Sequence, residues 1–130
     1  TTFEKPSAHW IIKPGREVLR TDVTPMMALN YDTTIHYIAI HLHMFAESLT
    51  LYDKTTGAIV YEGKVKHFSD KMGLEYVDRY SSEEGIPVYK DHEYELVSVY
   101  DNPTDEEYTG MAAMFLYLLD KESPHYSSTK

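Results

Sequence analysis

Residues 33–45 (TTIHYIAIHLHMF) constrain the fold more than any other part of the chain, because β-branched and aromatic residues fill them with a period of two. This alternation predicts a strand with one buried face. The even positions carry the aliphatic row Ile38, Ile40 and Leu42, so we expect that face in the core. His36 lies on the same face, which predicts a hydrogen-bonded structural histidine. His41 and His43 share the opposite face.

The same period recurs along the chain and predicts an all-β fold. We expect strands at 9–13, 17–21, 48–53, 58–66, 74–80, 86–90, 93–100 and 111–119. The run Lys54-Thr55-Thr56-Gly57 predicts a hairpin turn. Short strands at this spacing are typical of an antiparallel β-sandwich of the jelly-roll or Greek-key kind. Residues 109–120 also fit a helix, because Met, Ala and Leu are good helix formers.

The length of 130 residues fits a single domain over residues 1–130. We expect an ordered core at about 8–120, a linker-like start at 1–7, a polar stretch rich in turns at 69–85 and a tail at 122–130. No apolar run approaches the roughly 20 residues of a membrane span, so we expect no membrane insertion. The first residue is Thr1, which suggests a mature form or an excised domain.

Charge and cysteine content narrow the function. Twelve Lys and Arg against 21 Asp and Glu give a net charge of −9, which argues against nucleic acid and anionic membranes and favours cations. The absence of Cys excludes disulfides, thiolate metal sites and cysteine nucleophiles. Seven His and six Met remain as soft or borderline metal ligands.

The His-x-His pair is the best candidate for chemistry. On one face of a strand, the Cβ atoms of His41 and His43 lie roughly 6.5–7 Å apart, which lets two imidazoles bind one cation. Two neighbouring surface histidines are the alternative. Met111 falls on the less regular face of the last predicted strand, and core packing is the common fate of Met. If the two strands are neighbours, Met111 joins the histidines, and this donor set favours Cu(I).

Residues 32–48 resemble the copper-binding strand of the ascorbate-dependent copper type II monooxygenases, which include peptidylglycine α-hydroxylating monooxygenase. The likeness is to their C-terminal half-domain, whose oxygen-activating copper is bound by a His-x-His pair and one Met. The segment 104–117, with Met111 after an acidic loop, matches the family's methionine strand, and residues 9–15 resemble an early strand and turn. The resemblance therefore implies a β-sandwich that binds one copper through His41, His43 and Met111.

The departures from the family are equally informative. The chain has room for one half-domain only, without the three-histidine copper of the other half. Where the amidating enzyme has a substrate-binding Arg this chain has Ala39, and where it has Asn and Tyr after the Met this chain has Ala113 and Phe115. The family's disulfides are absent. The resemblance thus extends to the copper ligands but not to the substrate site.

The other histidines are secondary candidates. His9, His67 and His92 lie at predicted strand ends or turns, where we expect solvated side chains, although one of them as a fourth ligand stays open. His125 belongs to the tail. Met44 follows His43 directly but faces the other side of the strand, so we leave it out of the site.

These observations lead us to expect a monomeric copper-binding domain that captures, stores or delivers one Cu(I) or Cu(II) ion in copper homeostasis. Its partners would be the ion and a copper-donor, copper-acceptor or redox protein. The family implies a periplasmic or secreted location. One alternative is a copper-dependent monooxygenase that acts on an unknown small substrate with an external electron donor. A second alternative is a metal-free interaction domain.

Overall fold

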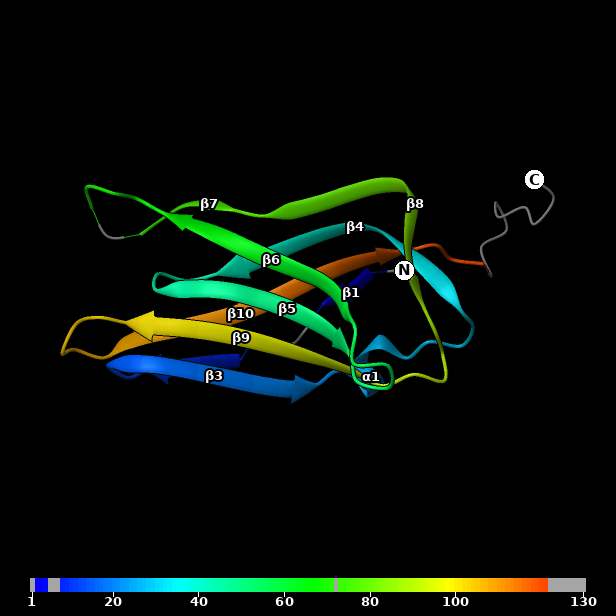
Figure 1. Ribbon diagram of the computed structural model, residues 1–130, viewed down its shortest axis with the longest axis horizontal. Helices are drawn as coiled ribbons and strands as arrows, with labels where there is room; N and C mark the ends of the chain where they lie inside the picture. Colours follow the sequence, from blue (N-terminus) through cyan, green and yellow to red (C-terminus); the bar gives the residue numbers. More distant parts are fainter. Residues whose placement is uncertain (1, 5–7, 72, 122–130) are drawn as a thin grey trace.

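The computed structural model describes residues 2–4, 8–71 and 73–121, and it is a sandwich of two antiparallel sheets (Figure 1). The first sheet contains β1 (Thr2–Glu4), β2 (Ala8–Ile12), β4 (Thr33–Leu42), β8 (Arg79–Val88) and β10 (Tyr108–Leu118). The second contains β3 (Gly15–Asp22), β5 (Ala46–Asp53), β6 (Ile59–His67), β7 (Leu74–Val77) and β9 (Tyr94–Asn102). A short helix, α1 (Thr24–Met27), follows β3. The predicted all-β sandwich is confirmed.

The first sheet is ordered so that β10 lies between β4 on one side and both β1 and β2 on the other. In the second sheet β9 and β5 are central, and β3 and β7 form the edges. In the described part of the chain there are six crossings between the sheets, and two of these connections join β4 to β5 and β9 to β10. Both connections lie at the left end of the molecule in Figure 1, whereas α1 lies at the right end.

The core forms where the inner faces of the two sheets meet. In β10 the even residues Ala112, Met114, Leu116 and Leu118 are all buried, as the alternation predicts. They pack against Ile38 and Leu42 of β4 and against Leu49 and Leu51 of β5 in one apolar cluster. The period-two reading of 111–119 therefore holds, and the alternative helix over 109–120 is wrong.

Residues 33–36 depart from the predicted alternation. A β-bulge in the pairing of β4 with β8 falls between Ile35 and Tyr37, and a bulge shifts the side chains on one side of it to the other face. Ile35 is consequently buried and His36 only half-buried, so the prediction that His36 belongs to the core face is wrong. Its predicted hydrogen bonding is confirmed: Nε2 lies 2.6 Å from the hydroxyl of Thr34, and Nδ1 lies 3.0 Å from the carbonyl oxygen of Ser82.

Two stretches contain more strand than the sequence predicts. In the polar stretch 69–85, the strand predicted at 74–80 corresponds to β7 and the start of β8, and β8, which pairs with β4, continues through residues 81–85, where no strand is predicted. Its charged and hydroxyl-bearing side chains conceal the strand because β8 is an edge strand with many exposed residues. The linker-like start includes β1, which pairs with the far end of β10 from Phe115 to Tyr117.

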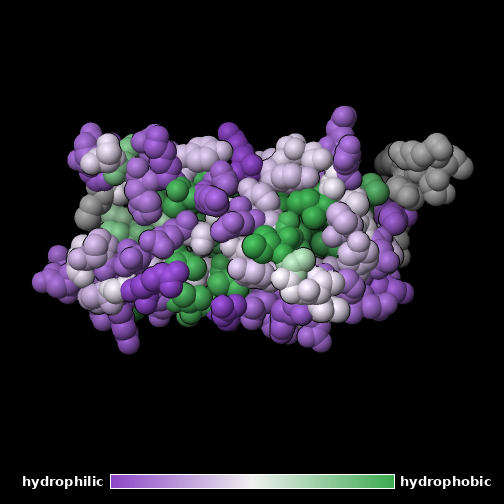
Figure 2. All heavy atoms as spheres, viewed as in Figure 1, coloured by the Kyte–Doolittle hydropathy of each residue, from purple (hydrophilic) through white to green (hydrophobic). Residues whose placement is uncertain are grey.

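Polar side chains cover most of the face seen in Figure 2, with hydrophobic patches between them. Among the described residues, no helix is long and apolar enough to span a membrane.

Candidate metal centre

The two predicted ligand strands are direct neighbours in the first sheet. In the ladder between β4 and β10, His41 lies opposite Ala113 and Leu42 opposite Ala112. The ladder ends at this last pair. Continued by one residue, the same register would set His43 opposite Met111, and the Tyr100 hydroxyl hydrogen-bonds to the backbones of both residues. Residues opposite each other in a ladder project to the same face. Sequence spacing predicts the shared face of the histidines, and the register adds Met111 to it.

The two imidazoles are close together on this face. The ring centroids of His41 and His43 are 5.5 Å apart, and the ring planes meet at 79°. His41 is exposed, whereas His43 and Met111 are half-buried. This exposure leaves the three side chains open to a dissolved ion. The end of β4 and the start of β10, to which these residues belong or adjoin, lie at the left end of the sandwich in Figure 1.

A hydrogen bond fixes the tautomer of His43. Nδ1 of the ring lies 3.1 Å from the backbone carbonyl oxygen of Thr109, the residue that precedes Gly110 in β10. A carbonyl only accepts, so Nδ1 carries the proton and donates it. In the neutral ring the lone pair is then on Nε2. Metal-binding histidines commonly donate their second ring nitrogen to a carbonyl in this way, which orients the ring.

The hydroxyl of Tyr100 joins the backbones of the two ligand strands. It accepts a hydrogen bond from the backbone N–H of His43 at 3.0 Å, and it donates one to the backbone carbonyl of Met111. We call this arrangement the hydroxyl bridge. Tyr100 comes from β9 in the opposite sheet and is 1% exposed. Burial raises the pKa of its phenol, and the hydrogen bonds to His43 and Met111 lower it by less, so the phenol keeps its proton at neutral pH. Sequence analysis missed this residue, because nothing in the chain marks which buried Tyr reaches another sheet.

The face beside the histidines is apolar along β10 but carries a charged residue from β8. Arg79 is exposed and lies opposite Ala39 in the ladder between β4 and β8, so it projects to the same face. Phe115 lies opposite Ala39 in the ladder, and Ala113 lies opposite His41. These are the three positions at which the resemblance leads one to look for substrate-binding side chains. None of them carries a hydrogen-bonding or charged side chain. The surface next to the candidate ligands therefore has nothing at these positions to hold a carboxylate or a peptide.

The other histidines have separate roles. His92 lies in the turn before β9, with Nδ1 2.6 Å from Oδ2 of the buried Asp53, so the expectation of a solvated side chain is wrong for this residue. His67 is exposed, as expected, and donates from Nε2 to the carbonyl of Ala46 at 2.9 Å. The backbone of His9 pairs with that of Met111, but its side chain lies outside the described part of the chain, as does the whole of His125.

Met44 lies in the turn between β4 and β5 and is half-buried against the core. With Phe45 and His67 it lines a pocket of about 310 Å³. In the described residues, no three His, Asp or Glu side chains form a group that could hold a metal ion. The candidate site of His41, His43 and Met111 differs from such a group because its third side chain is a thioether.

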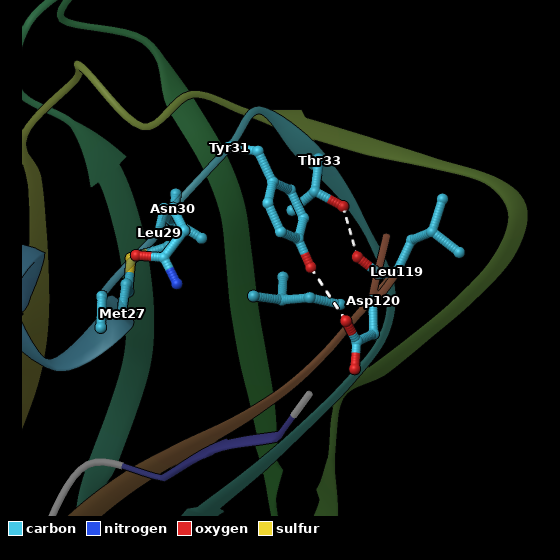
Figure 3. A pocket seen from close by; sticks show the side chains of 9 residues that line it. Met27, Leu29, Asn30, Tyr31, Thr33, Leu119 and Asp120 are labelled. Atoms are coloured by element: carbon cyan, nitrogen blue, oxygen red, sulfur yellow. Dashed lines mark hydrogen bonds between the residues drawn. The ribbon is translucent and has the colours of Figure 1, made fainter. Parts of the chain in front are cut away.

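A second pocket, of about 170 Å³, lies at the opposite end of the sandwich (Figure 3). Two hydrogen bonds close one side of it, from the hydroxyl of Tyr31 to Asp120 at 3.0 Å and from the hydroxyl of Thr33 to the carbonyl of Leu119 at 2.6 Å. Its lining contains none of the candidate copper ligands. Met27 and Leu29 lie on its other side.

Comparison of the chain with protein-family models, curated proteins and solved structures gives no match.

Proposed function

We propose that this domain binds a single copper ion through His41, His43 and Met111 and serves to capture, store or deliver it. The observation that supports the proposal is the pairing of β4 with β10, whose register, continued by one residue, would bring Met111 to the face that His41 and His43 share. The tautomer of His43 fits, because a ligand imidazole needs its lone pair on the ring nitrogen that faces the metal. Two imidazoles and a thioether suit Cu(I), and the imidazoles also accept Cu(II).

Binding is favoured over catalysis because the three positions at which the resemblance would put substrate-binding side chains are apolar. A hydroxylating enzyme must hold its substrate beside the metal in a fixed orientation. Ala39, Ala113 and Phe115 supply no polar anchor at these positions, and the nearest cation on this face is the exposed Arg79, which comes from the neighbouring strand β8. A copper ion at this edge would instead be open to a partner protein that donates or accepts it. The periplasmic or extracellular location implied by the resemblance is part of the same proposal.

Copper titrations of single variants test the ligand set. We expect His41→Ala, His43→Ala and Met111→Leu each to weaken Cu(I) binding by about tenfold or more, since each removes one donor atom. Met111→Leu keeps an apolar side chain of similar size, so its effect reports the sulfur and not the packing. It should weaken Cu(II) binding less than Cu(I) binding, because the thioether is the soft ligand.

Two control variants complete this experiment. Met26→Leu makes the same change at a half-buried Met of α1, at the opposite end of the sandwich, and His125→Ala removes an imidazole from the tail. Both should bind copper as the unaltered chain does. Unchanged Cu(I) affinity in Met111→Leu would contradict the assignment of the third ligand, and unchanged affinity in both histidine variants would contradict the site.

A further inference from the structure

Tyr100 connects β4 and β10 beyond the end of their ladder. The last pair of this ladder is Leu42 with Ala112. The next residues along the two strands, His43 and Met111, are joined through the Tyr100 hydroxyl, which accepts from the backbone N–H of His43 and donates to the backbone carbonyl of Met111. The side chain that holds these two backbones together thus comes from the second sheet, through the core.

The ring of Tyr100 is itself held in place. Trp10 of β2 meets it edge to face, with ring centroids 5.3 Å apart and planes at 84°. Trp10 packs in turn against the apolar core. A hydroxyl on a ring that is 1% exposed and wedged against a neighbour has little freedom to follow a moving backbone. A change in the separation of His43 and Met111 beyond the few tenths of an ångström that a hydrogen bond tolerates would therefore break one of its two hydrogen bonds.

We propose that Tyr100 is a positioning residue for the copper site, whose hydroxyl sets the separation of His43 and Met111 and thereby favours Cu(I) over Cu(II). This inference rests on the proposed function. Tyr100 touches the backbones of the two ligand residues and acts only through them. Without this hydroxyl, the backbone of Met111 would be free to move relative to the backbone of His43. Cu(I) depends more on the thioether than Cu(II) does, so the affinity for Cu(I) would fall more.

A buried Tyr also needs a hydrogen-bond partner for stability alone, so the test must separate positioning from folding. Tyr94 provides the matched control. It lies in the same strand, β9, and is also 1% exposed, but its hydroxyl accepts from the N–H of Tyr89 at the opposite end of the sandwich. Tyr94→Phe and Tyr100→Phe are the same substitution at equal burial.

The experiment measures Cu(I) and Cu(II) affinities of the full chain and of both variants. We expect Tyr100→Phe to weaken Cu(I) binding about tenfold and Cu(II) binding less, which changes the ratio of the two affinities. Tyr94→Phe should leave both affinities and their ratio unchanged. A loss of folding stability alone moves both ions together. An unchanged ratio in Tyr100→Phe, or an equal change in Tyr94→Phe, would overturn the inference.

A measurement without metal distinguishes this inference from the proposed function. Amide hydrogen exchange at His43 should become faster in Tyr100→Phe than in the unaltered chain, while the amide of Ile38 in the middle of β4 keeps its rate. Equal exchange rates at His43 in the two proteins would show that the hydroxyl bridge does not restrain this backbone. If the unaltered chain binds no copper, the proposed function falls and the copper part of this inference falls with it. The exchange rate then still decides whether Tyr100 fixes the two backbones.

Discussion

At the scale of the residue, Asp53 ties together the two turns at the end of the molecule away from the candidate ligands. Its carboxylate accepts hydrogen bonds from the N–H groups of Thr55 and Thr56 at 2.9 and 3.2 Å and lies 2.6 Å from Nδ1 of His92. Burial raises the pKa of this carboxyl. The hydrogen bonds from His92, Thr56 and Thr55, with the attraction of His92, outweigh burial and hold the pKa below 3.8.

The lowered pKa gives a pH dependence of known sign. The ionised carboxylate is favoured by the folded state, so its contribution to stability is fully present above about pH 5 and is lost as the pH falls below about 4. We expect Asp53→Asn to lower the free energy of unfolding by about 1–3 kcal/mol at pH 7, because it weakens charge-assisted hydrogen bonds. Urea unfolding at several pH values should show this difference shrink between pH 5 and pH 3. A constant difference over that range would contradict the assignment.

At the scale of the element, Gly110 lets β2 pack closely against β10. A Cβ on this residue would lie 2.6 Å from both Cδ1 and Cγ1 of Ile12 and 3.2 Å from Cε2 of Trp10. Ile12 is fully buried, so it has no room to move away. We expect Gly110→Ala to destabilise the fold by about 1–3 kcal/mol, as overpacking does in a dense core. Chemical denaturation measures this loss.

The neighbouring exposed position gives the control for this prediction. Thr109→Ala alters a side chain in solvent and retains the backbone carbonyl that accepts from His43. It should change the free energy of unfolding by less than about 0.5 kcal/mol. If Gly110→Ala and the unaltered chain have the same free energy of unfolding, β2 can move away from β10 at this position without a loss of stability.

Period-two patterning predicts the strands whose inner face is purely aliphatic, such as β10, because burial alone selects those residues. It fails for residues 81–85 of β8, where an edge strand keeps polar side chains, and at residues 35–37, where a bulge shifts the alternation. For the candidate site, spacing predicts that His41 and His43 share a face. The position of Met111 beside the histidines depends on which strands are neighbours, and the role of Tyr100 depends on a contact between the two sheets. Neither can be predicted from the residues next to them in the sequence.

At the scale of the whole molecule, a domain with one candidate copper site is expected not to hydroxylate peptides. Monooxygenation of the type that the proposed resemblance suggests needs two electrons, and the 130 residues offer one candidate copper site to supply them. We expect no hydroxylated or amidated product when the chain is supplied with copper, ascorbate and glycine-extended peptides. Mass spectrometry of the peptide measures it. Stoichiometric product that disappears in His43→Ala would establish the monooxygenase alternative instead.

The contact between Trp10 and Tyr100 makes this end of the sandwich optically distinct. Trp10 is the single tryptophan of the chain, so all indole fluorescence comes from one ring, and that ring touches the residue that bridges the two ligand strands. Trp10 also lies opposite Gly110, next to the Met111 position. The emission of the unlabelled protein is therefore a local signal from the candidate copper centre, whereas the tyrosines report on many parts of the fold at once.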